Sequence, residues 1–154
     1  MSTNESKPFT YLIRVRYYEC DAQQVVFNAR YGDYVDTAAT EFFRALFGDY
    51  KNLLAQGLDT QVVKQTIQWQ APARFDDVLA IKVKTGRIGN TSFQLDFTLL
   101  DFTNGRAIAT CEIVYVMVDA ANFTKKPIPE LIRRQLHGGA PGVIANHAGA
   151  DLTT

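Results

Sequence analysis

The residues Tyr17–Phe47, YYECDAQQVVFNARYGDYVDTAATEFFRALF, set the architecture of this chain. Their second half carries apolar side chains at i, i+3, i+4 and i+7, the spacing of a helix with one buried face. Asn28 stands just ahead of this helix and is predicted to cap it with its side chain. The apolar stripe consists of Tyr31, Tyr34, Val35, Ala38, Phe42, Ala45 and Leu46.

Beyond this helix the chain is predicted to be mainly β-structure, because apolar residues alternate with polar ones at a period of two. The predicted strands are residues 9–18, 61–70, 78–87, 91–101 and 106–119, and the predicted short helices are residues 49–56 and 129–136. Since the helix can bury its stripe only against a sheet face, we expect an α+β domain with about five antiparallel strands wrapped around one long central helix.

Composition and length favour one ordinary globular domain. The chain has 154 residues, and its 16 basic and 16 acidic residues cancel, so no nucleic-acid partner is expected. No segment approaches the roughly 20 apolar residues of a membrane span, so no membrane partner is expected either. We predict a domain at residues 9–137 with flexible termini at 1–8 and 138–154, because neither terminus has a periodic apolar face.

The reactive side chains exclude several classes of site. The two cysteines lack metal-ligand spacing and do not form a disulfide framework, and the two histidines come only at positions 137 and 147. No metal site or Ser-His-Asp triad is therefore expected. The polar N-terminus does not resemble a signal peptide, so a reduced, cytoplasmic protein is predicted.

Asp21 is the candidate catalytic residue that remains. It lies seven residues before Asn28, where the first turn of the predicted helix offers unpaired N–H groups. A carboxylate supplies a base or a nucleophile, and the N–H groups stabilise a developing negative charge. The alternative is that Asp21 only shapes a turn, which is common for Asp. Cys20 next to it lacks a histidine partner and is interpreted as a packed small residue.

The run from Tyr18 to Phe43 resembles the opening motif of the 4-hydroxybenzoyl-CoA thioesterase family of hotdog-fold proteins. Later matches are residues 71–83, the NTSF turn at 90–93, and residues 105–119. The resemblance extends over residues 11–136 and implies a hotdog fold. The chain departs from the family pattern at Gln23-Gln24, where small residues are common, and at Asn28, where Tyr or His is common.

This resemblance implies an acyl-CoA thioesterase, with Asp21 as nucleophile or general base and the backbone N–H of Asn28 on the thioester oxygen. It implies a homodimer or homotetramer with the site between subunits, and no cofactor, because coenzyme A is part of the substrate. The nucleotide end of coenzyme A is expected near Arg87, Asn90, Thr91 and Ser92.

Two other functions stay open at this point. One is a non-catalytic acyl-CoA or acyl-carrier binding protein on the same fold. The other is a hotdog dehydratase or hydratase, which typically uses a histidine. The sequence does not identify the acyl group. Four aromatic residues are candidates either for an acyl pocket or, more commonly, for the core: Tyr17, Tyr18, Phe27 and Trp69.

Overall fold

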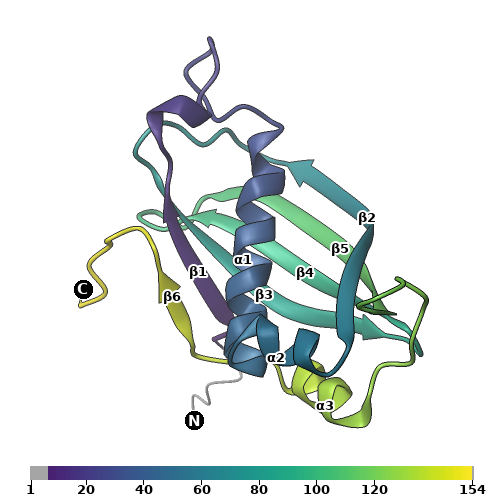
Figure 1. The fold of residues 1–154 in the computed structure, drawn as a ribbon. Coiled ribbons are helices and arrows are strands. Elements are labelled where there is room, and N and C mark those ends of the chain that lie inside the picture. The colour runs from purple at the N-terminus through teal and green to yellow at the C-terminus, as the bar shows by residue number, and fades with distance from the viewer. Residues whose placement is uncertain (1–6, 154) are drawn as a thin grey trace.

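A computed structural model of the chain describes residues 7–153, in which one curved sheet wraps around one side of a long helix (Figure 1). The sheet has six strands in the order β2-β5-β4-β3-β1-β6. All neighbouring strands are antiparallel except β1 and β6, which are parallel. The elements are β1 (Phe9–Arg14), the 3-10 helix η2 (Tyr17–Glu19), α1 (Arg30–Phe47), α2 (Tyr50–Ala55), β2 (Leu58–Trp69), β3 (Val78–Ile88), β4 (Ser92–Asp101), β5 (Ala107–Asp119), α3 (Glu130–Gly138) and β6 (Ile144–Asn146).

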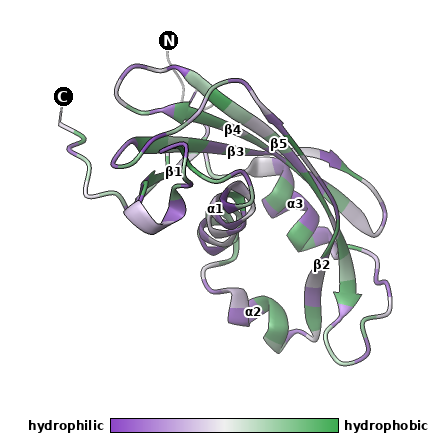
Figure 2. Ribbon diagram, turned by 90° about the horizontal axis from the view of Figure 1, so that it is seen from above, coloured by the Kyte–Doolittle hydropathy of each residue, from purple (hydrophilic) through white to green (hydrophobic). Residues whose placement is uncertain are grey.

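Helix α1 lies inside the curve of the sheet and buries one face there. Figure 2 shows it end-on, with the strands passing around it. Ala45 is exposed, whereas Ala39 and Phe43, outside the predicted stripe, are buried. Phe43 is buried because the curved sheet reaches around the helix: its ring lies 6.0 Å from Phe93 and 5.5 Å from Tyr115. The predicted stripe therefore lies on the correct face of the helix, but the buried face is wider than predicted.

The predicted alternation is confirmed in β4, whose every second side chain is buried in the core. The sheet has one strand more than expected, and the first strand is shorter, because β1 ends at Arg14 and the chain then turns into η2. This turn is the first element of the candidate site. None of the helices in residues 7–153 has the length and apolar character needed to cross a membrane.

Strand β2 is a long edge of the sheet. Within residues 7–153 it pairs only with β5, and eleven of its twelve residues are exposed or half-buried. Val62, Val63 and Trp69 are among the exposed large apolar side chains. The outer edge of such a strand has unpaired backbone N–H and C=O groups, so it can pair with a strand of another chain.

The C-terminal segment predicted to be flexible packs partly on the sheet. Residues 144–146 form β6 beside β1, and the N–H of His147 donates to the carbonyl of Leu12 (2.9 Å). Ala148 is buried against Leu12 on the outer face of the sheet. Three residues are too few to show a period, so this strand could not be predicted from local pattern. Of the predicted flexible N-terminus, residues 1–6 lie outside the described residues.

Deleting residues 143–154 is expected to lower the free energy of unfolding by about 2–4 kcal/mol, because Leu12 loses its cover and β1 loses its hydrogen-bonded neighbour. For a chain of this size, that corresponds to a fall in Tm of about 5–15 °C, measured by thermal denaturation. Deleting only residues 151–154 is the control and should leave Tm unchanged. Equal Tm values for both deletions would restore the flexible-tail prediction.

Candidate active site

The segment between η2 and α1 folds as a small hairpin with Asp21 near its tip. The N–H of Phe27 donates to the carbonyl of Glu19 (2.9 Å), and the N–H of Asp21 donates to the carbonyl of Val25 (2.9 Å). Gln24 closes the turn with a φ of 66°. Glycine adopts such a φ most readily, and this chain has a glutamine at that position instead.

The Asp21 carboxylate is held by its own turn and is half-buried. One oxygen, Oδ1, accepts the N–H of Gln23 at 2.8 Å. The other oxygen meets no hydrogen-bond donor within the described part of the chain. The turn role that Asp commonly has is therefore present, and it orients the side chain while leaving one carboxylate oxygen free for chemistry.

The start of α1 offers backbone N–H groups without acceptors in the described residues, but its N-cap is not the residue predicted from the sequence. The N-cap residue is Ala29, and no side chain caps the helix, so the prediction that Asn28 caps α1 is wrong. Main-chain bonds close this turn instead, with the N–H of Arg30 donating to the carbonyl of Phe27 (2.9 Å). The N–H groups of Asn28 and Ala29 meet no acceptor in residues 7–153. Such free donors at a helix start suit an oxyanion.

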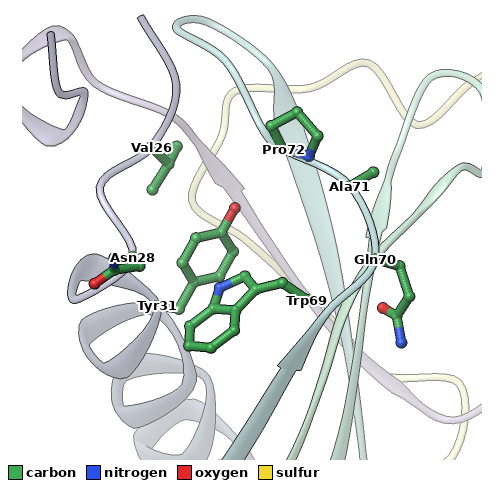
Figure 3. Close-up of a pocket in the computed structure, with 7 residues that line it drawn as sticks. All are labelled: Val26, Asn28, Tyr31, Trp69, Gln70, Ala71 and Pro72. Carbon is green, nitrogen blue, oxygen red and sulfur yellow. The ribbon is translucent and has the colours of Figure 1, made fainter. Parts of the chain in front are cut away.

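A groove of about 310 Å³ lies between the start of α1 and the end of β2 (Figure 3). Its main walls are the rings of Tyr31 and Trp69, whose centroids are 6.0 Å apart at 87°. The lining side chains carry no formal charge, so the groove suits an uncharged group. The lining residues are Val26, Asn28, Tyr31, Trp69, Gln70, Ala71 and Pro72.

The hairpin is attached to one wall of this groove. The N–H of Val26 donates to the carbonyl of Ala73 (2.8 Å), and Val25 forms an isolated bridge with Arg74. Val26 and Asn28 of this hairpin line the groove, whereas Asp21 on the same hairpin is not among the lining residues. Within one chain the structure brings Asp21, Asn28 and the aromatic groove into one region.

Of the two alternatives left open for Tyr17, Tyr18, Phe27 and Trp69, the core is wrong, because all four side chains are exposed. Their exposed fractions run from 46% for Phe27 to 81% for Tyr17. Trp69, at 50%, lines the groove, and the ring of Tyr18 lies 5.3 Å from the guanidinium of Arg30. The strand pattern placed these rings inside because it could not show that β2 is an edge and that residues 17–19 leave the sheet.

The residues predicted for the nucleotide end lie at the opposite end of the sheet from Asp21. β3 begins beside β1, near the hairpin, and its eleven residues lead to the turn at residues 89–91, about 30 Å away. There the carbonyl of Asn90 accepts from Ile128 (2.9 Å) and the carbonyl of Thr91 from Met117 (2.7 Å). One chain does not bring Arg87, Asn90, Thr91 and Ser92 to Asp21.

Other reactive groups do not compete with Asp21. The pKa of the Cys20 thiol is raised by burial and then by the carboxylates of Glu19 and Asp21, so the thiol stays protonated near neutral pH. The His147 ring contacts Tyr11 (3.2 Å) on β1, and His137 lies on α3. Residues 7–153 contain no group of three or more potential ligands placed to hold a metal ion.

Sequence reasoning missed two contributors to this region. Tyr31 was predicted only as a core residue of the α1 stripe, yet it also lines the groove. Glu19 was not singled out, yet it is buried directly before the hairpin. The signal for Glu19 was weak, because an acidic residue in a loop is normally exposed and its partner Tyr34 lies 15 residues along the chain.

The chain matches known proteins along most of its length. Residues 15–136 match the model of the thioesterase-like superfamily. The chain is 29% identical to the acyl-CoA thioester hydrolase YbgC of Escherichia coli, over 80% of this chain and 92% of that protein. It also resembles the solved structures of a hypothetical protein from Aquifex aeolicus (26% identity, TM-score 0.77, 84% of this chain and 99% of that one) and of a gentisyl-coenzyme A thioesterase (27%, 0.72, 80% and 98%). The chain therefore belongs to the thioesterase-like superfamily and has the hotdog fold expected from its sequence.

Proposed function

We propose that this protein is an acyl-CoA thioesterase that hydrolyses a thioester to a carboxylic acid and coenzyme A. The observation that carries the proposal is the pairing of a half-buried Asp21 carboxylate, with one free oxygen, and an open N–H at Asn28 beside an aromatic groove. Relatives named as acyl-CoA thioester hydrolases support the reaction class.

Each group in this region has a part in the proposed reaction. The N–H of Asn28 donates to the thioester oxygen, where negative charge develops during attack. Asp21 attacks the carbonyl carbon itself, or it takes a proton from the water that attacks. The hairpin pairing separates the Cα atoms of Asp21 and Asn28 by roughly 10 Å, which the Asp side chain and the thioester group between them can fill.

The acyl group is proposed to lie in the groove against the packed rings of Tyr31 and Trp69, where uncharged lining residues favour an uncharged group. Water is the only co-reactant, and coenzyme A enters as part of the substrate. Both cysteines are free, which supports a reducing compartment such as the cytoplasm as the place of reaction.

Assay of a panel of acyl-CoA thioesters for free-thiol release tests this function. The panel should include aromatic, short aliphatic and medium aliphatic acyl groups, and at least one should be hydrolysed with saturation. Binding of acyl-CoA without hydrolysis would favour the non-catalytic alternative. The dehydratase alternative typically uses a histidine at the site, and neither His137 nor His147 lies on the Asp21 hairpin or lines its groove.

The active unit is proposed to be at least a dimer, formed where β2 of one subunit pairs with β2 of a second. The edge of β2 is open for pairing within the described chain, and it leads directly to Trp69 at the groove. Since Arg87 and residues 90–92 lie far from Asp21 in one chain, they are proposed to hold the nucleotide end of a substrate bound to another subunit's Asp21.

Light scattering at micromolar concentration should give a mass of at least twice 17.2 kDa. The double variant Val62→Asp/Val63→Asp, which charges the exposed edge, should shift the mass toward the monomer. Leu54→Asp is the control, because Leu54 is exposed to a similar degree but lies on α2. A monomeric wild-type protein with full thioesterase activity would contradict the shared site.

A further inference from the structure

Glu19 is a buried carboxylate that the proposed reaction does not use. Only 4% of the residue is exposed, and a buried charge is costly unless it is paired and hydrogen-bonded. Its Oε1 accepts the N–H of Arg16 at 2.7 Å and the hydroxyl of Tyr34 at 2.9 Å. The guanidinium of Arg16 lies 3.9 Å from Oε2. The carboxylate is thus well satisfied, and its partners come from separate elements.

These bonds connect the two halves of the candidate site. Glu19 lies two residues before Asp21, and its backbone carbonyl accepts from Phe27, the residue just before Asn28. Tyr34 is 1% exposed and lies on the second turn of α1, the helix whose start offers the open N–H groups. The side chain of Glu19 therefore ties the hairpin that carries Asp21 to the body of α1.

Tyr34 contributes to this link as a donor. The pKa of its hydroxyl is raised, first by burial and then by the hydrogen bond to Glu19, so the hydroxyl keeps its proton. The Tyr34 ring is held in the core, and its hydroxyl keeps its proton. Tyr34 is therefore a rigid hydrogen-bond donor to the carboxylate.

We infer that Glu19 and Tyr34 form a positioning pair that holds the hairpin, and with it the Asp21 carboxylate, in place relative to the start of α1, where the oxyanion donor at Asn28 lies. This inference rests on the proposed function. Neither residue touches the substrate; both act through the hairpin. A displacement of about 1 Å between reacting groups can lower a rate about 100-fold, so loss of the pair should reduce kcat while substrate binding is retained.

The test compares Tyr34→Phe with Tyr50→Phe. Tyr50 also donates its hydroxyl to a carboxylate, Asp59 (2.6 Å), but α2 and β2 hold that pair away from the hairpin. Tyr34→Phe should lower kcat by about 10- to 100-fold with KM nearly unchanged, whereas Tyr50→Phe should keep kcat. Glu19→Gln, whose amide oxygen still accepts from Tyr34, should retain more activity than Glu19→Ala.

Amide hydrogen exchange provides a readout that needs no activity. Exchange in residues 19–28 should become faster in Tyr34→Phe and Glu19→Ala but not in Tyr50→Phe. A Tyr34→Phe variant with wild-type kcat and wild-type exchange in residues 19–28 would overturn the positioning pair. If the wild-type protein hydrolyses no thioester, the proposed function fails, and hydrogen exchange alone then decides whether the pair holds the hairpin.

Discussion

Replacing Asp21 by asparagine should lower kcat by about 100- to 10,000-fold while KM for the same acyl-CoA changes little. The amide oxygen of asparagine can still accept the N–H of Gln23, so the turn that holds the side chain is retained. What is lost is the negative charge and the basicity of the free oxygen. If Asp21 is the nucleophile, the loss should be larger still, because no covalent intermediate can form.

The measurement is thiol release from the best substrate of the acyl-CoA panel, with the fold of each variant checked by circular dichroism. Asp33→Asn is the matched control: Asp33 is an exposed carboxylate in the first turn of α1, and its loss should leave kcat close to wild type. Cys20→Ala and His137→Ala should also retain most activity. A folded Asp21→Asn variant with more than about a tenth of wild-type kcat would remove Asp21 from the catalytic role.

The parts of the fold that local patterns could predict are those whose burial follows from neighbours in sequence. The α1 stripe is buried from Tyr31 to Phe42, and every second residue of β4 is buried along the whole strand. Trp69 and β6 were not predictable in this way, because an edge strand has the same pattern as an inner one and β6 pairs with a segment about 130 residues away.

The residues of the candidate site also include some that local sequence predicts and some that it does not. Asp21 could be identified because its spacing from the start of α1 is local and resembles a family motif. The cap at Asn28 was placed one residue too early, since Ala29 has no side-chain oxygen to mark it. Glu19 and Tyr34 come together only when α1 packs into the sheet, so no local sequence pattern predicts their hydrogen bond.

Replacing Asn28 by proline tests the second half of the proposed chemistry. Proline removes the backbone N–H, and in this protein that N–H supports no hydrogen bond within residues 7–153. The N–H bond of the preceding Phe27 to the carbonyl of Glu19 is not touched by the substitution. The variant should therefore fold, and kcat should fall by about 100- to 1,000-fold, the usual effect of losing one oxyanion donor.

Asn28→Ala is the control, because it separates the effect of the side chain from that of the backbone N–H. It removes a side chain that lines the groove but keeps the N–H, and that side chain makes no capping bond to α1, so kcat should fall far less than in Asn28→Pro and the change should appear mainly in KM. Equal loss in Asn28→Ala and Asn28→Pro would assign the effect to the side chain. If instead Ala29→Pro were the inactive variant and Asn28→Pro were active, the donor would be the N–H of Ala29, which also meets no acceptor in the described residues.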